Sequence, residues 1–111
     1  MTDFLAAALQ LTSTSDVDAN FSAAEEQIDL AARRGADFIG LPENFAFIGD
    51  DQTRLDIASS LSEKCNRFLV TMARRYQIVL LGGGFPVPAA DNNRTLNRSE
   101  LIGRDGQLLG R

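Results

Sequence analysis

A single carboxylate between two apolar runs is the residue of this sequence best placed to do chemistry. Residues 37–49 read DFIGLPENFAFIG, so Pro42 and Glu43 directly follow a strand-like run. Proline fixes its own φ and keeps the preceding residue extended, and Glu43 is therefore presented at the carboxyl edge of a sheet, where α/β proteins place their ligands. One interpretation of this pattern is a general base. An exposed loop acid beside a proline is the structural alternative.

Two phenylalanines follow this acid closely. Phe45 and Phe47 are large enough to shield the Glu43 carboxylate from water. Desolvation disfavours the charged form of a carboxylate and makes it a better base near neutral pH. We therefore expect both rings to lie around Glu43.

The elements that must position Glu43 alternate along the chain. Strand-like apolar runs are separated by segments in which apolar residues recur every three or four positions, as on one face of a helix. The order is β-α-β-α-β, which is typical of a parallel sheet with crossover helices. The predicted strands are residues 4–11, which we expect to be buried, 37–41 and 77–81; one helix face holds Val17, Phe21, Ala24, Ile28 and Ala31, and the other holds Leu61, Cys65, Phe68 and Met72.

Capping patterns predict where these helices begin and end. Ser15 with Asp18, and Ser60 with Glu63, have the spacing of a capping box, in which two side chains satisfy free N–H groups at a helix start. Gly35 is placed to end the first helix, because glycine readily adopts the left-handed conformation required there.

The character of the chain changes after the third predicted strand. The glycines at 82–84 predict a tight turn rather than a phosphate-binding loop, because no helix pattern follows them directly. Residues 94–103 then predict a strand, and Asp105 with Gly106 predicts a hairpin turn into a return strand.

The predicted topology leaves one face of the sheet without a cover. Two right-handed crossovers that extend a sheet in one direction put both helices on the same face. We expect Phe38, with Ile78 or Leu80, to lie on the other face. Monomers rarely expose large apolar patches, so this face requires a second layer or a second chain.

Composition excludes several function classes. A chain of 111 residues is one domain or part of one, and its net charge of -4 without a basic face argues against nucleic acid. One cysteine and no histidine exclude a disulfide framework and argue against structural zinc. Asp50 and Asp51 are adjacent acids, and such pairs are usually solvated rather than metal-binding.

The N-terminal run lacks the features of a signal peptide and is too short to span a membrane. We therefore expect a cytoplasmic chain, and we expect no cofactor.

Four segments in order resemble the nitrilase superfamily, the carbon–nitrogen hydrolases. GADFIGLPENFAF is similar to the family's glutamate motif, and the segments LAAALQL, FLVTMARRYQIVLLGGGFPV and TLNRSELIGRDGQLLGR are similar to its first strand, its next helix and strand, and its hairpin. The resemblance covers nearly the whole chain. It implies an αββα sandwich, of which residues 1–111 are a partial, N-terminal portion.

The resemblance also implies a reaction, the hydrolysis of a small amide or, as the second choice, a nitrile. In this family a cysteine attacks the substrate carbon, a lysine stabilises the developing charge, and a glutamate moves protons. Glu43 matches the glutamate, whereas the lysine and the cysteine would follow Arg111. We therefore expect the chain alone to be inactive, and to self-associate or form a homo-oligomer. The alternative is a non-catalytic Rossmann- or flavodoxin-like module, although the first turn lacks G-x-G-x-x-G.

The triplet Glu63-Lys64-Cys65 contains the same three residue types but does not predict a catalytic site. Neighbouring side chains on a helix point about 100° apart and cannot converge on one substrate. Cys65 lies on the apolar helix face, where burial raises the pKa of a thiol and makes it inert. We predict that Cys65 is a core residue.

Overall fold

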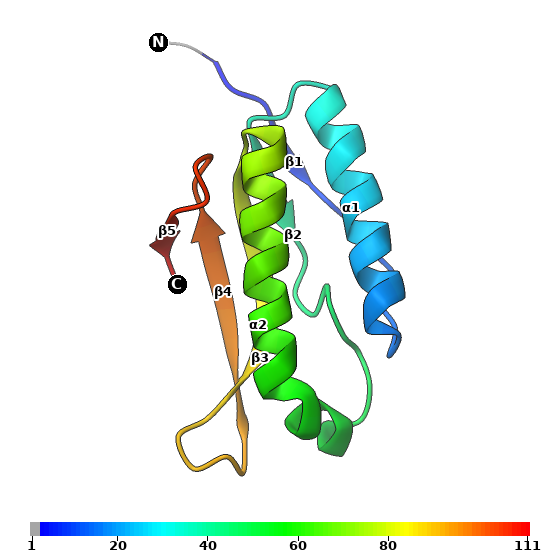
Figure 1. The fold of residues 1–111 in the computed structure, drawn as a ribbon. Helices are drawn as coiled ribbons and strands as arrows, with labels where there is room; N and C mark the ends of the chain where they lie inside the picture. The colour runs from blue at the N-terminus through cyan, green and yellow to red at the C-terminus, as the bar shows by residue number, and fades with distance from the viewer. Residues whose placement is uncertain (1–2) are drawn as a thin grey trace.

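One mixed sheet, covered by two helices, makes up the computed structural model, which describes residues 3–111 (Figure 1). The sheet has five strands in the order β1-β2-β3-β4-β5; β1, β2 and β3 pair in parallel and the last two strands pair antiparallel. This confirms the predicted β-α-β-α-β order followed by a hairpin. The elements are β1 (Ala6–Ala8), α1 (Val17–Arg33), β2 (Phe38–Leu41), α2 (Asp51–Tyr76), β3 (Val79–Pro88), β4 (Thr95–Ile102) and β5 (Leu108–Gly110).

Both helices lie on the same face of the sheet, α1 against β2 and α2 against β3 and β4 (Figure 1). Ile39, Leu80 and Ile102 are fully buried beneath the helices. The opposite face carries Phe38 and Val79, which are register partners and remain partly exposed. The prediction for Phe38 is therefore confirmed.

The same prediction was wrong for Ile78 and Leu80, which are 1% and 0% exposed. Side chains alternate between the two faces of a strand, and a Cβ on Gly82 would lie 2.4 Å from Leu69 of α2. Ile78 and Leu80 therefore share the helix-covered face with Gly82, and Leu81 lies on the open face.

The first strand is shorter and more exposed than predicted. Instead of residues 4–11, β1 contains only Ala6–Ala8, and Phe4 is 71% exposed. β1 pairs with β2 alone among the described strands. An edge strand with one neighbour buries less surface than a central one, which explains the difference from the buried strand we expected.

The helix starts differ from the predicted capping boxes. Asp16, and not Ser15, caps α1, because its Oδ1 accepts the N–H of Ala19 at 3.1 Å. Aspartate is among the strongest N-cap residues, and here it outcompetes the serine beside it. Gly35, with φ at 92°, follows the end of α1 as predicted.

The start of α2 lies well before the predicted Ser60. Asp50 caps this helix by accepting the backbone N–H and the hydroxyl of Thr53, at 2.9 and 2.8 Å. These hydrogen bonds lower the pKa of the Asp50 carboxyl below its usual value. Ser60 lies inside the helix and donates to the carbonyl of Ile57, a bond that serine makes within helices as well as at their ends.

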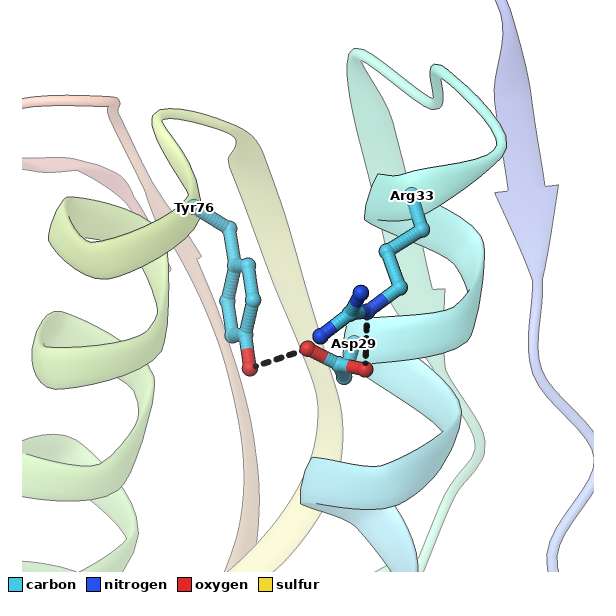
Figure 2. Close-up of polar contacts among 3 residues, drawn as sticks. All are labelled: Asp29, Arg33 and Tyr76. Atoms are coloured by element: carbon cyan, nitrogen blue, oxygen red, sulfur yellow. Dashed lines mark hydrogen bonds and ion pairs between the residues drawn. The ribbon is translucent and has the colours of Figure 1, made fainter.

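A polar clamp joins the two helices near their C-terminal ends (Figure 2). The carboxylate of Asp29 accepts Nε of Arg33 at 2.7 Å and the hydroxyl of Tyr76 at 3.0 Å. These two hydrogen bonds lower the pKa of the Asp29 carboxyl. The bond from Tyr76 to Asp29 thus links the C-terminal end of α2 to that of α1. No helix within residues 3–111 is long and apolar enough to cross a membrane.

Candidate functional site

Glu43 lies just beyond the carboxyl end of β2 and is held from the far side of β3. Nδ2 of Asn97, on β4, donates to Oε1 of Glu43 at 2.9 Å, across 54 positions of sequence. Because β3 lies between β2 and β4, this hydrogen bond bridges over β3. The structure thus confirms that Glu43 is presented at the sheet edge where ligands bind in α/β proteins.

The glycine run makes room for this bridge. A Cβ on Gly84, whose φ is +53°, would lie 2.7 Å from Cγ of Glu43 and 2.8 Å from Oδ1 of Asn97. A Cβ on Gly83 would lie 2.2 Å from the carbonyl oxygen of Leu41. No side chain fits at either position without moving β2 or the bridge.

The predicted tight turn at the glycines was therefore wrong. β3 continues through Gly82, Gly83 and Gly84 to Pro88, and its register against β4 shifts between Gly82 and Phe85. The glycines serve close packing, and the positive φ of Gly84 is the conformation that favours glycine. Ser99 of β4 fixes the irregular segment, because its Oγ accepts the N–H of Gly84 at 3.1 Å.

The residue after Glu43 fixes the loop on two sides. Asn44 adopts φ of 58°, and its N–H donates to the carbonyl of Gly84 at 2.8 Å. Its side-chain Oδ1 accepts Nη1 of Arg54, on α2, at 3.1 Å. The loop is thereby tied to both β3 and α2, which limits the positions that the Glu43 side chain can take.

The two phenylalanines do not shield Glu43. Phe45 and Phe47 are 0% and 1% exposed and belong to the hydrophobic core, whereas Glu43 is exposed. The ring of Phe45 packs edge-on against that of Phe85, with 6.3 Å between centroids. Burial of the rings under the helices releases more free energy than covering one carboxylate would, so they anchor the loop and leave Glu43 open to solvent.

A polar anchor on α1 completes the support of this loop. Asn20 is 4% exposed, and its Nδ2 donates to the carbonyls of Thr14 and Ala46 at 2.7 and 2.9 Å. Its Oδ1 accepts the N–H of Thr14 at 2.9 Å. Asn20 thus joins the segment before α1 to the segment after Glu43.

A pocket of about 140 Å³ lies beside Glu43. A larger groove, of about 450 Å³, adjoins it and shares Arg54 and Thr95 with it. The Glu43 carboxylate, which the amide of Asn97 holds, can accept a proton. The neighbouring guanidinium of Arg54 and the solvent-accessible pocket can orient a small polar molecule. The residues that line the pocket are Glu43, Asn44, Arg54, Pro86, Thr95, Leu96 and Asn97.

Cys65 is not part of this site. It is 0% exposed in the core, and burial raises the pKa of its thiol to about 12. The prediction of an inert core cysteine is confirmed for its burial and its pKa.

The described residues contain no group of three or more His, Cys, Asp and Glu side chains that could hold a metal ion. Asp50, one of the two adjacent acids, serves as the cap of α2.

One buried acid lies elsewhere. Glu100, on β4, is 2% exposed and accepts Nδ2 of Asn66 at 2.9 Å and Nε of Arg111 at 3.0 Å. Each carboxylate oxygen of Glu100 thus has a partner. Since satisfied buried polar groups are the norm in folded proteins, this network is structural.

Asn97, Gly84 and Arg54 belong to the site but were not predicted from the sequence as site residues. The one local signal for Asn97 was its place near the start of the segment TLNRSELIGRDGQLLGR, which resembles the family's hairpin. Nothing in the local sequence indicates that Arg54 reaches the loop after Glu43, since that contact depends on where α2 starts.

Comparison with known proteins places the chain among hydrolases. The carbon-nitrogen hydrolase family matches residues 5–111. The deaminated glutathione amidase of Synechocystis is 46% identical over 112 residues, which is 100% of this chain and 41% of the relative. The omega-amidase of Mus musculus is 29% identical over 98% of this chain and 39% of its own length.

Solved structures have the same fold. The nitrilase and fragile histidine triad fusion protein of Caenorhabditis elegans superimposes with a TM-score of 0.85 and 28% identity, over 93% of this chain and 26% of that one. An amidase from Nesterenkonia shares the fold, with a TM-score of 0.84, 20% identity, and coverage of 97% and 42%. The chain thus spans less than half the length of these relatives. On the evidence of the family match, the chain belongs to the carbon–nitrogen hydrolases of the nitrilase superfamily.

Proposed function

We propose that residues 1–111 form the N-terminal part of an amidase domain that hydrolyses the carbon–nitrogen bond of a small amide, with Glu43 as general base. The observation that carries the proposal is the 2.9 Å hydrogen bond from Asn97 to Glu43, built over a glycine that no other residue can replace without a clash. Such a bridge fixes a carboxylate in one orientation, which general base catalysis requires.

The rest of the catalytic set follows from the family resemblance. A cysteine thiolate attacks the amide carbon, the amine or ammonia leaves, and water then hydrolyses the acyl-enzyme. Glu43 takes the proton from the thiol and gives it to the leaving amine or ammonia. Glu43 then takes a proton from the attacking water and returns it to the cysteine when the acid leaves, and a lysine stabilises the negative charge on the substrate oxygen. Of these three residues, only the glutamate has a match to the family's motif within residues 1–111. Cys65 cannot replace the cysteine, because its thiol is buried and its pKa is about 12.

A longer chain that includes a C-terminal portion of the amidase domain tests the role of Glu43 as general base. In the extended chain, residues 1–111 are followed by the C-terminal portion of the Synechocystis relative. Glu43→Gln keeps the shape and the hydrogen bond to Asn97 but removes the base, so we expect kcat for a small amide to fall about 10²–10⁴-fold. Glu26→Gln, at an exposed position of α1, is the control and should keep kcat within about twofold.

The 111-residue chain is the second arm of the experiment and should hydrolyse no amide. A folded extended chain whose amide turnover is unchanged by Glu43→Gln contradicts the role of Glu43. Turnover by the 111-residue chain that Cys65→Ser abolishes contradicts the assignment of Cys65 to the core.

A further inference from the structure

The register shift between Gly82 and Phe85 makes a β-bulge beside Glu43. These two glycine and phenylalanine positions are three residues apart on β3, but their partners on β4 are only two residues apart. Gly83 and Gly84 therefore lie opposite the single residue Ser99. A bulge disrupts the ladder of backbone hydrogen bonds locally, so the extra residue must be held by other groups.

The backbone of Gly84 is held from two sides. Its N–H donates to Oγ of Ser99 at 3.1 Å, and its carbonyl accepts the N–H of Asn44 at 2.8 Å. The first bond attaches the bulge to β4. The second attaches the loop that follows β2 to the bulge, so Ser99 and Asn44 are joined through one residue.

The strand β4 thus reaches the Glu43 loop by two routes. Asn97 donates directly to Oε1 of Glu43, and Ser99 acts through Gly84 on the residue after Glu43. Because Asn97 and Ser99 are two positions apart on a strand, their side chains lie on the same face of the sheet. Both routes depend on the place of Gly84, since a Cβ there would lie within 3 Å of Glu43 and of Asn97.

A glycine segment needs such an external restraint. Glycine has the largest backbone freedom of all residues, and β3 has three glycines in a row at the bulge. A serine hydroxyl oxygen accepts an N–H well, and removing it leaves the N–H of Gly84 without this partner. Ser99 therefore limits how far the bulge can move.

We propose that Ser99 is a positioning residue for the reaction: its hydroxyl fixes the bulge at Gly84 and thereby the orientation of the Glu43 carboxylate. Ser99 acts through Gly84 and not on the substrate. This inference rests on the proposed function of the Glu43 site and adds to it a residue that sets how well the base is oriented.

Threonine and valine at position 99 provide a matched pair, because they have nearly the same branched shape and only threonine has a hydroxyl. In the extended chain, Ser99→Thr should keep kcat for butyramide within about twofold. Ser99→Val should lower kcat about 3–10-fold, which is the range for the loss of one hydrogen bond between uncharged groups, and should change KM less than about twofold. The control Ser60→Ala, which removes a hydroxyl bonded within α2, should leave kcat within about twofold.

A double-mutant cycle separates positioning from a general loss of structure. Where Glu43→Gln has removed the base, Ser99→Val should change the remaining kcat less than about 1.5-fold, because no base is left to orient. An equal fall of kcat in both backgrounds, an unchanged kcat in Ser99→Val, or an equal fall in Ser99→Thr overturns the inference and leaves the role of Glu43 intact. An unchanged kcat in Glu43→Gln contradicts the proposed function, and the inference fails with it.

Discussion

Replacing Gly84 with alanine is expected to destabilise the chain more than the same change at Gly35, although both glycines have positive φ. Gly35 has φ of +92° and no atom within 4 Å of an added Cβ, so Gly35→Ala measures the conformational penalty alone. That penalty is about 1–2 kcal/mol for an alanine in the left-handed region.

At Gly84 the same penalty is joined by a steric one. The added methyl would lie 2.7 Å from Cγ of Glu43 and 2.8 Å from Oδ1 of Asn97, and 3.3 Å from Cα of Glu43. Overpacking of this kind costs about 1–3 kcal/mol, whether it is relieved by moving the loop or by breaking the bridge. We therefore expect about 2–5 kcal/mol in total for Gly84→Ala, a large part of the stability of a small domain, which is about 5–15 kcal/mol.

Urea unfolding followed by circular dichroism measures both variants. Each is unfolded at a few micromolar and at tenfold higher concentration, because self-association would add its own contribution to the apparent stability. Equal losses of unfolding free energy in Gly35→Ala and Gly84→Ala would refute the reasoning, since they would mean that the space above Gly84 is not needed for the Glu43–Asn97 bridge.

Two further predictions concern the core and the open sheet face. Because the folded pKa of Cys65 is about 12 and its ordinary value is 9.0, its contribution to stability is complete below pH 9 and is lost as the pH rises toward 12, by about 1.4 kcal/mol per pH unit. Urea midpoints between pH 8 and 10.5 should therefore fall more steeply than in Cys65→Ala, and parallel slopes would contradict the burial of the thiol. The 111-residue chain should self-associate at tens of micromolar through the face that carries Phe38, Val79 and Leu81, and a double Val79→Thr, Leu81→Thr variant should associate less in sedimentation. A monomer that unfolds cooperatively and binds no hydrophobic dye would show that this face needs no cover.

Features that repeat within a few residues could be predicted from the sequence. The apolar spacing of three and four residues identified the buried faces of both helices and placed Cys65 in the core, where it is 0% exposed. The proline after a strand-like run placed Glu43 at the end of β2. Gly35 marked the end of α1. Each of these predictions depends on backbone periodicity or on the conformational limits of one residue, and both act locally.

Features that depend on competition between neighbours were predicted less well. Asp16 caps α1 although Ser15 beside it has the spacing of a capping box, and Asp50 caps α2 well before Ser60, which lies inside that helix. Several side chains near a helix start can accept its free N–H groups, and the spacing of residue types does not say which one does.

The sequence by itself determined the order of the elements, which face of each helix is buried, and the position of Glu43 at a strand end. The first two follow from the alternation of apolar and polar residues, and the third from the proline after a strand-like run. Only the tertiary structure decided that Asn97 reaches Glu43, that Gly84 must leave space for both, and that Phe45 and Phe47 turn into the core. These contacts join residues far apart in the chain, and they depend on the register shift between β3 and β4 and on where α2 begins. No local pattern records a register, because it is fixed by packing of the whole sheet against the helices.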